Sequence, residues 1–173
     1  ITMIPAMTFL ITVALAGLIG NSIVLSVYSR KFKKNPTRIL IMTIAVFDLV
    51  ANVIAIPGDI YDMFHIWNFD NPPLCRARLF MTSFVTLSAG ISLLAVAVVR
   101  YRKLCKPHDW QISVTHAKVI SLVIACIGAL SSIPYSVTNG RQTKVTPRSD
   151  ILAYECSEDD EYKDTIWPTI NNG

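Results

Sequence analysis

Four long runs of hydrophobic residues, each nearly free of charge, dominate the chain. Residues 1–29, 79–99 and 119–139 contain no charged residue, and residues 39–58 contain only Asp48. A helix needs about 20 predominantly apolar residues to cross the hydrocarbon core of a bilayer. The pattern therefore predicts an all-α membrane protein with four spanning helices.

The polar segments between these runs set the expected boundaries within one membrane domain, residues 1–173. The expected elements are helices at about 3–29, 37–63, 73–105 and 114–138, an extracellular loop at 139–164, and the start of a fifth helix at about 165–173. Pro57 lies inside the second run, where its ring should kink or end the helix.

The loop at 139–164 has the composition of a β-hairpin. Residues 142–146 and 151–156 are rich in β-forming side chains, and they flank a Pro-Arg-Ser-Asp sequence typical of a turn. We expect these residues to form a hairpin lid over one end of the bundle.

Composition and charge narrow the class of protein. With 52% hydrophobic and 16% charged residues and a mean hydropathy of +0.45, the chain is too apolar for a soluble domain. Ten lysines and arginines lie in the segments 30–38 and 100–118, and the other six lie in the alternate loops with most of the acidic residues. Basic residues favour the cytoplasmic side, so we expect an extracellular N-terminus. The net charge of +4 is then no sign of nucleic-acid binding.

A series of short motifs, in this order and spacing, resembles the class A (rhodopsin-like) G-protein-coupled receptors. The motifs are Gly20-Asn21, Asp48, Trp67-Asn68-Phe69, Cys75, Arg100-Tyr101 and Cys156. The sequence from Val99 to Pro107 is similar to the end of the third helix and the second inner loop of peptide-receptor-like members. The resemblance implies the first four helices of a seven-helix bundle in the plasma membrane. It also implies an extracellular peptide ligand, a heterotrimeric G protein as partner, and no enzymatic activity.

Several positions depart from the family pattern. Val99 occupies the place of the acid that usually precedes Arg100, and Ala89 occupies the place of a common serine. The tryptophan expected near residues 124–127 is missing. The first departure removes the acid that in the family pairs with the arginine.

The four cysteines can be separated by their expected side of the membrane. Cys105 falls in the cytosol and Cys126 inside the fourth helix, so only Cys75 and Cys156 share the oxidising side. A bridge between them would tether the third helix to the lid, as in the receptor family.

Asp48 and Asn21 are the polar residues expected within the membrane. Similarity to the family implies that Asp48 faces the bundle interior near Asn21, where many members bind a sodium ion. A protonated Asp48 that shares hydrogen bonds is the alternative, and Asn21 alone could serve as an interhelical hydrogen-bonding residue. No other cofactor is expected, because His65, His108 and His116 lie in separate loops or helix ends and are not expected to form a cluster.

Arg100 and Tyr101 are the candidate G-protein-coupling residues at the inner end of the third helix. In the family this arginine engages the terminal helix of the G protein. The alternative is an arginine that reaches into the lipid headgroups without a further role.

The candidate ligand-binding residues lie near the outer ends of the helices and in the lid. They are Asp62, Arg78, Thr82 and Glu155. Thr82 stands where amine receptors of the family carry an aspartate, which argues against an amine ligand. The acidic residues 158–161 form either a solvated face or a surface that steers a cationic peptide.

Two other classes of protein fit part of the pattern. One is a four-helix membrane scaffold or junction protein, which would pair the cysteines within one outer loop. The other is a truncated receptor form that does not signal. Cys75 and Cys156 lie in different loops, which favours the receptor.

Overall fold

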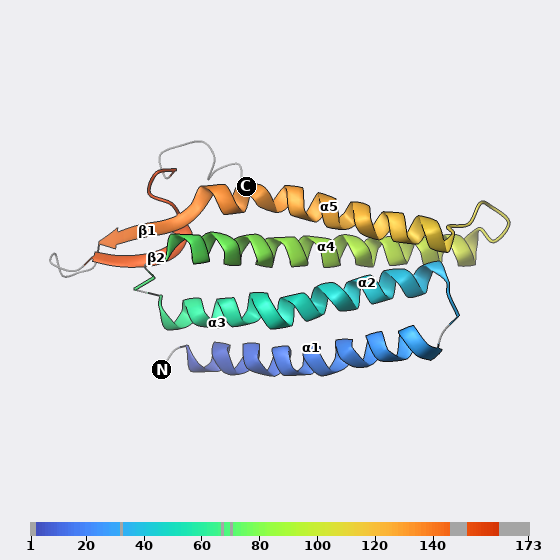
Figure 1. Ribbon diagram of the computed structural model, residues 1–173, viewed down its shortest axis with the longest axis horizontal. Helices are drawn as coiled ribbons and strands as arrows, with labels where there is room; N and C mark the ends of the chain where they lie inside the picture. Colours follow the sequence, from blue (N-terminus) through green and yellow to red (C-terminus); the bar gives the residue numbers. More distant parts are fainter. Residues whose placement is uncertain (1–2, 32, 67, 70, 146–151, 163–173) are drawn as a thin grey trace.

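Four long helices run side by side and antiparallel, and a two-stranded hairpin lies at one end of them (Figure 1). The computed structural model describes residues 3–31, 33–66, 68–69, 71–145 and 152–162. This arrangement confirms the predicted fold class, an all-α bundle with a hairpin in a loop. Trp67, the turn at 147–150 and the expected fifth helix at 165–173 lie outside the described residues.

The helix α1 (Ile4–Lys31) lies at one side of the bundle and packs against the second span. Its side chains are mostly exposed in the isolated chain, including Phe9 at 68% and Ile19 at 64%. An apolar side chain on such a helix faces lipid or a neighbouring helix. Each of the four spans is long and apolar enough to cross a bilayer.

The second span consists of α2 (Pro36–Val50), a π-helical turn η1 (Ala51–Ala55) and α3 (Ile56–Phe64). Pro57 has no N–H, and its ring would clash with the carbonyl four residues earlier in a regular helix. The wider π turn lies directly before it, where the Ile56 N–H donates to the Ala51 carbonyl. The helix therefore continues past Pro57 instead of ending there.

The remaining spans, α4 (Pro72–Cys105) and α5 (Val114–Thr138), begin at side chains that cap their first turn. The Asn71 side chain accepts a hydrogen bond from the Leu74 N–H at 3.2 Å, and Ser113 caps α5 in the same way. In α2 the equivalent acceptor is Asn35. Such caps contribute about 1 kcal/mol each to a helix start.

Small buried residues let α4 and α5 approach closely. Ser88, Ser92 and Ser132 are fully buried, and the backbone at Gly128 lies against the Ser88 hydroxyl. At the opposite end of the bundle from the hairpin, Leu40, Val99 and Ala117 form an apolar cluster that joins α2, α4 and α5.

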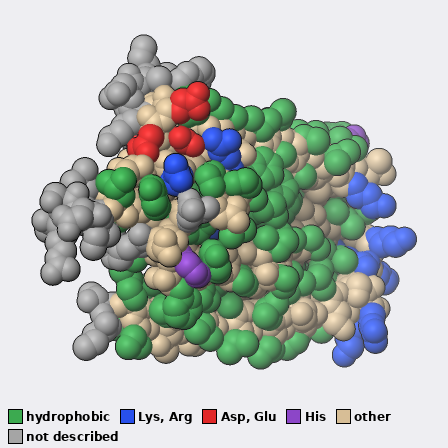
Figure 2. Space-filling model, turned by 60° about the vertical axis from the view of Figure 1, so that its left-hand side comes forward, with side chains coloured by type: hydrophobic (Ala, Val, Ile, Leu, Met, Phe, Trp, Pro, Cys, Tyr) green, Lys and Arg blue, Asp and Glu red, His purple; other side chains and the backbone are tan. Residues whose placement is uncertain are grey.

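The hairpin strands β1 (Asn139–Val145) and β2 (Leu152–Glu158) pair antiparallel. Both strands extend beyond the predicted ranges, because β1 continues directly from the end of α5. We call the end of the bundle that carries the hairpin the lid end and the opposite end the basic end. Figure 2 shows acidic side chains gathered at the lid end and a band of Lys and Arg at the basic end.

Candidate functional site

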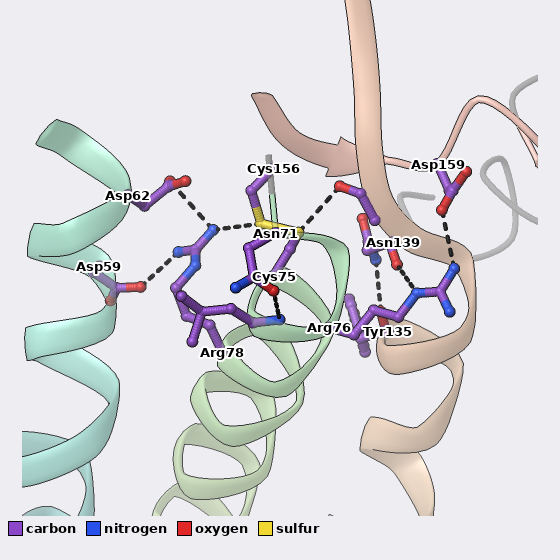
Figure 3. The surroundings of a disulfide bond; sticks show 12 residues. Asp59, Asp62, Asn71, Cys75, Arg76, Arg78, Tyr135, Asn139, Cys156 and Asp159 are labelled. Carbon is purple, nitrogen blue, oxygen red and sulfur yellow. Dashed lines mark hydrogen bonds and ion pairs between the residues drawn. A yellow bond between two sulfur atoms is a disulfide. The ribbon is translucent and has the colours of Figure 1, made fainter. Parts of the chain in front are cut away.

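A disulfide between Cys75 and Cys156 ties the first turn of α4 to strand β2, as the sequence predicted (Figure 3). The two Cα atoms are 5.5 Å apart and Cys75 is fully buried. The Cys75 Sγ lies 3.1 Å from the Gly140 carbonyl oxygen, which is a contact only, because a disulfide sulfur has no hydrogen to donate. The hairpin is thus held over the end of α4.

The guanidinium of Arg78, one turn along α4, lies between two carboxylates of α3. Its Nη1 is 2.7 Å from Asp59 and its Nη2 is 3.2 Å from Asp62. The same Nη2 lies 3.1 Å from the Cys156 sulfur. Only 11% of the Arg78 side chain is exposed, so these charge-assisted contacts are shielded from water. We call Asp59, Asp62 and Arg78 the outer charge cluster.

Thr82 lies one helical turn deeper than Arg78 on the same face of α4. Its hydroxyl oxygen is buried and has no hydrogen-bond partner among the described residues. A buried hydroxyl without a partner is costly, so this group is available to a ligand or to a segment of protein packed against it.

Arg76 and Asp160 make further polar contacts that hold the lid. Arg76 donates from Nη2 to Asp159 at 3.0 Å and from Nε to the Asn139 carbonyl at 3.1 Å. The carboxylate of Asp160 accepts from the Thr143 N–H. Two of the acidic residues at 158–161 therefore make contacts within the protein, so this run is not only a solvated face.

The fourth ligand-binding candidate, Glu155, forms an ion pair with Lys144 across the hairpin. The first outer loop also joins the lid: Phe69 is 2% exposed, and its N–H donates to the Tyr154 carbonyl at 2.9 Å. The Phe of the predicted Trp-x-Phe motif thus packs beneath β2, while Trp67 lies outside the described residues.

Asp48 and Asn21 are not joined by a hydrogen bond in the part of the chain that the structure describes. The Asn21 amide donates to the Gly17 carbonyl at 3.0 Å, within its own helix. The Asp48 carbonyl accepts from the Asn52 side chain at 2.6 Å. Asn52 in turn packs against Gly17, where a Cβ would overlap its amide.

A sodium ion at Asp48 stays a prediction. The Asp48 carboxylate has no hydrogen bond or ion pair to the described residues, and the Ser88 hydroxyl points to Gly128 in the interface with α5. Among the described residues no group of three His, Cys, Asp or Glu lies close enough to hold a metal. The described spans therefore offer one carboxylate and not a complete ligand set.

At the basic end, Arg100 and Tyr101 are exposed on α4. Arg100 has no ion pair or hydrogen bond with the described residues, and it lines a hollow of about 440 Å³ together with Tyr28 and Arg38. Val99 points away from it, into the apolar cluster with Leu40 and Ala117. The guanidinium is thus accessible, and no neighbouring acid holds it.

Asp59 and Asn52 are among the residues with structural contacts at these sites that were not singled out from the sequence. Asp59 shares the Arg78 guanidinium, and its spacing of three residues from Asp62 places both on one helix face. Asn52 follows Asp48 by four residues, which also indicates a shared face. Spacing along the helix was the available signal in both cases.

Comparison with known proteins gives a match over most of the chain. The family described as 7 transmembrane receptor (rhodopsin family) matches residues 20–171. The neuropeptide Y receptor type 6 of Mus musculus is 29% identical over 170 residues, which is 92% of this chain and 43% of that receptor. The neuropeptide Y receptor type 6 of Oryctolagus cuniculus is 31% identical with the same coverage.

A receptor named for another peptide also matches. The neuromedin-U receptor 1 of Mus musculus is 24% identical over 148 residues, or 83% of this chain and 35% of that receptor. The chain thus spans less than half the length of these relatives. The matched proteins are receptors and not enzymes, and the comparisons give no support to a four-helix scaffold.

Proposed function

Because this chain belongs to the rhodopsin family of seven-transmembrane receptors, we propose that it forms part of a receptor that binds an extracellular peptide and signals to a heterotrimeric G protein. As a member of this family with four spanning helices, it is a multi-pass plasma-membrane protein. The relatives named for neuropeptide Y and neuromedin U support a peptide as the class of ligand.

The lid end faces the extracellular side in this proposal. A disulfide persists in an oxidising compartment, and Cys75–Cys156 lies at the lid end. The segments 30–38 and 100–118 carry ten of the sixteen lysines and arginines, and such segments favour the cytoplasmic side. Two independent features therefore support the same orientation.

The outer charge cluster is the observation that carries the ligand site. It joins α3, α4 and the disulfide of the lid within hydrogen-bonding distance, so a ligand bound there would contact three segments at once. Two carboxylates face one guanidinium, which leaves one negative charge, and the exposed Glu161 adds another at the same end. An acidic surface attracts a cationic peptide and accelerates its association.

The basic end supplies the proposed contact with the G protein. Arg100 is exposed and without an ion pair to the described residues, so its donors are free to bind the carbonyls at the end of a docked helix. Tyr101 is 57% exposed beside it.

A chimaeric receptor tests the proposal. Residues 1–173 would replace the matching part of the mouse neuropeptide Y receptor type 6, and nucleotide exchange on the G protein would be measured in response to neuropeptide Y and neuromedin U. We expect a peptide-dependent increase in exchange. Residues 1–173 expressed alone should give none, because in this family the G protein also contacts the fifth and sixth helices.

Matched substitutions in the chimaera separate ligand binding from folding. Asp62→Asn should weaken the peptide response, because it removes a charge of the outer cluster, while Asp109→Asn removes a charge from the inner loop and should leave peptide affinity unchanged. A chimaera that reaches the cell surface with its disulfide intact, yet responds to no peptide, would contradict the proposal.

A further inference from the structure

A hollow of about 380 Å³ lies at the basic end, between the start of α2, the end of α4 and the loop that leads to α5. Its polar wall is formed by Asn35, Thr37 and Gln111, and its charged rim by Arg102 and Lys103. Among its described lining residues none is acidic. We call it the headgroup hollow. Its volume lies within the range of about 300–1,000 Å³ that is typical of small-molecule sites.

The headgroup hollow adjoins the hollow that Arg100 lines, and Asn35, Thr37 and Lys103 line both. Val99, Arg102 and Lys103 follow the spacing i, i+3 and i+4, which places them on one side of α4 with Val99 at the base. Arg100 lines the hollow of about 440 Å³ described above and not the headgroup hollow. Lys103 is exposed and without an ion pair to the described residues.

A second, wholly apolar groove of about 260 Å³ begins where the headgroup hollow ends. Val99 and Ile112 line both spaces, and the groove runs between α4 and α5 along Leu94, Val98, Ile120 and Ile124. We call it the tail groove. All of its lining residues are aliphatic, so it would accept a hydrocarbon chain and offers no partner to a polar one.

Charge at this end of the bundle favours an anionic occupant. The segments 30–38 and 100–118 contain ten basic residues and one acid, Asp109, which lies 3.9 Å from Lys106. Arg102 is held in place by its contact with the Trp110 carbonyl at 3.1 Å and by the Trp110 ring. A preorganised arginine beside an exposed lysine is well suited to phosphate oxygens.

We propose that the headgroup hollow and the tail groove together bind one anionic phospholipid of the adjoining leaflet, with its phosphate at Arg102 and Lys103 and one acyl chain along α4 and α5. Basic pockets between helices on the cytoplasmic side bind lipid headgroups of this kind. The assignment to the cytoplasmic leaflet rests on the proposed orientation of the receptor. The binding itself requires neither the peptide nor the G protein.

The test is lipid retention by the purified chain. The chain is reconstituted in nanodiscs of phosphatidylcholine that contain phosphatidylserine or phosphatidylinositol 4,5-bisphosphate, transferred to mild detergent, and examined by native mass spectrometry. We expect one anionic lipid per chain and no comparable retention of phosphatidylcholine. Equal retention of all three lipids would overturn the proposal.

Two matched variants locate the site. Lys103→Gln should reduce retention about fivefold, the effect expected for one basic residue near a lipid headgroup. Lys33→Gln removes the same charge at the same end, but Lys33 lines neither space, so retention should not change. Both residues are exposed, and an intact Cys75–Cys156 disulfide verifies folding. Equal loss of lipid retention in both variants would mean that any positive charge at this end has the same effect, and it would overturn the proposed site.

Soluble inositol 1,4,5-trisphosphate distinguishes a lipid from a free phosphate compound. If the tail groove contributes, the long-chain lipid stays bound when the soluble headgroup is added at equal concentration. Complete displacement would overturn the two-part site. These outcomes are independent of the signalling assay, so failure here leaves the proposed receptor function intact, and the reverse also holds.

Discussion

At the scale of single residues, Arg78 joins α4 to both α3 and the disulfide of the lid. Its two terminal nitrogens contact Asp59, Asp62 and the Cys156 sulfur, and its side chain is 11% exposed. Without it, the two carboxylates of α3 would face each other with no counter-charge. The residue is therefore a candidate for both stability and ligand selectivity.

We expect Arg78→Gln to lower the free energy of unfolding by about 1–3 kcal/mol, because two partly buried carboxylates lose their nearly buried charged partner. Thermal unfolding in detergent, followed by circular dichroism, measures the change. Arg76→Gln is the control. Its side chain is 41% exposed and bridges one carboxylate, so about 0–1 kcal/mol is expected. Equal losses of stability in the Arg78 and Arg76 variants would contradict the inference that burial strengthens the Arg78 contacts.

Val99 illustrates how a single position is constrained by its surroundings. It is 6% exposed and packs with Leu40 and Ala117. We expect Val99→Asp to lower the amount of folded protein at the cell surface more than Val99→Ala, because a carboxylate in this cluster is desolvated unless it reaches Arg100. Surface labelling of the two variants compares them. Equal surface levels would mean that the carboxylate has found a partner.

At the scale of elements, the contact between α4 and α5 depends on the missing side chain of Gly128. A Cβ there would overlap the Ser88 Oγ, while the Ser88 Cβ and the Phe84 carbonyl oxygen are 3.4 Å away. The close approach of the two helices thus depends on one hydroxyl fitting against one glycine.

A double-mutant cycle tests this contact. Gly128→Ala should destabilise the chain by about 1–3 kcal/mol through overpacking, and Ser88→Ala in the same chain should recover most of that loss, because the overlapping oxygen is removed. Gly90→Ala on α4 meets nothing within 4 Å and should be neutral or stabilising. Additive effects at positions 88 and 128 in thermal unfolding would count against direct contact.

The long helices were predictable from the sequence because membrane-spanning length and apolar character are properties of a continuous segment. The hairpin followed from turn composition, but its start at Asn139 did not, since α5 passes into β1 without a loop. The π turn at Ala51–Ala55 was also not predicted. Pro57 indicated a disturbance of the helix, but either a kink or an end would satisfy a proline.

The residues of the candidate sites were predictable from the sequence, but which of these residues contact one another was less predictable. Cys75 and Cys156 were the two cysteines on one side of the membrane, and they are bonded. Asp62 and Arg78 were named separately as ligand candidates, yet they contact each other. Sequence identifies the charges on each element, but which charges meet depends on how the helices pack around one another.

At the scale of the whole molecule, the disulfide fixes how the lid is placed relative to the bundle. Cys75 and Cys156 are separated by 81 residues, which include all of α5 and β1. The bond therefore closes a loop around nearly half of the chain. Its formation requires α4, α5 and the hairpin to be assembled together.

We expect non-reducing peptide mapping of surface-expressed protein to find Cys75 linked to Cys156, and Cys105 to react with a thiol reagent from the cytosolic side. Cys105 is exposed at the end of α4, beyond the apolar run. Cys105→Ser should leave surface expression unchanged, whereas Cys75→Ser should lower it. Recovery of Cys75 as a free thiol from folded protein would contradict the assignment.

The π turn holds one residue more than a regular α-helix would need over the same rise, and this decides where the chain tolerates a change of length. One residue turns an α-helix by about 100°. A one-codon deletion within Ala51–Ala55, made together with Pro57→Ala to remove the ring clash of a regular helix, would restore regular spacing and keep Asp59 and Asp62 facing α4. α4 is α-helical throughout Pro72–Cys105 and holds no spare residue. The same deletion between Arg78 and Val99 would rotate the Arg78 end of α4 by about 100° relative to its Val99 end. The contacts of α4 at the lid end and those at the basic end then could not form together.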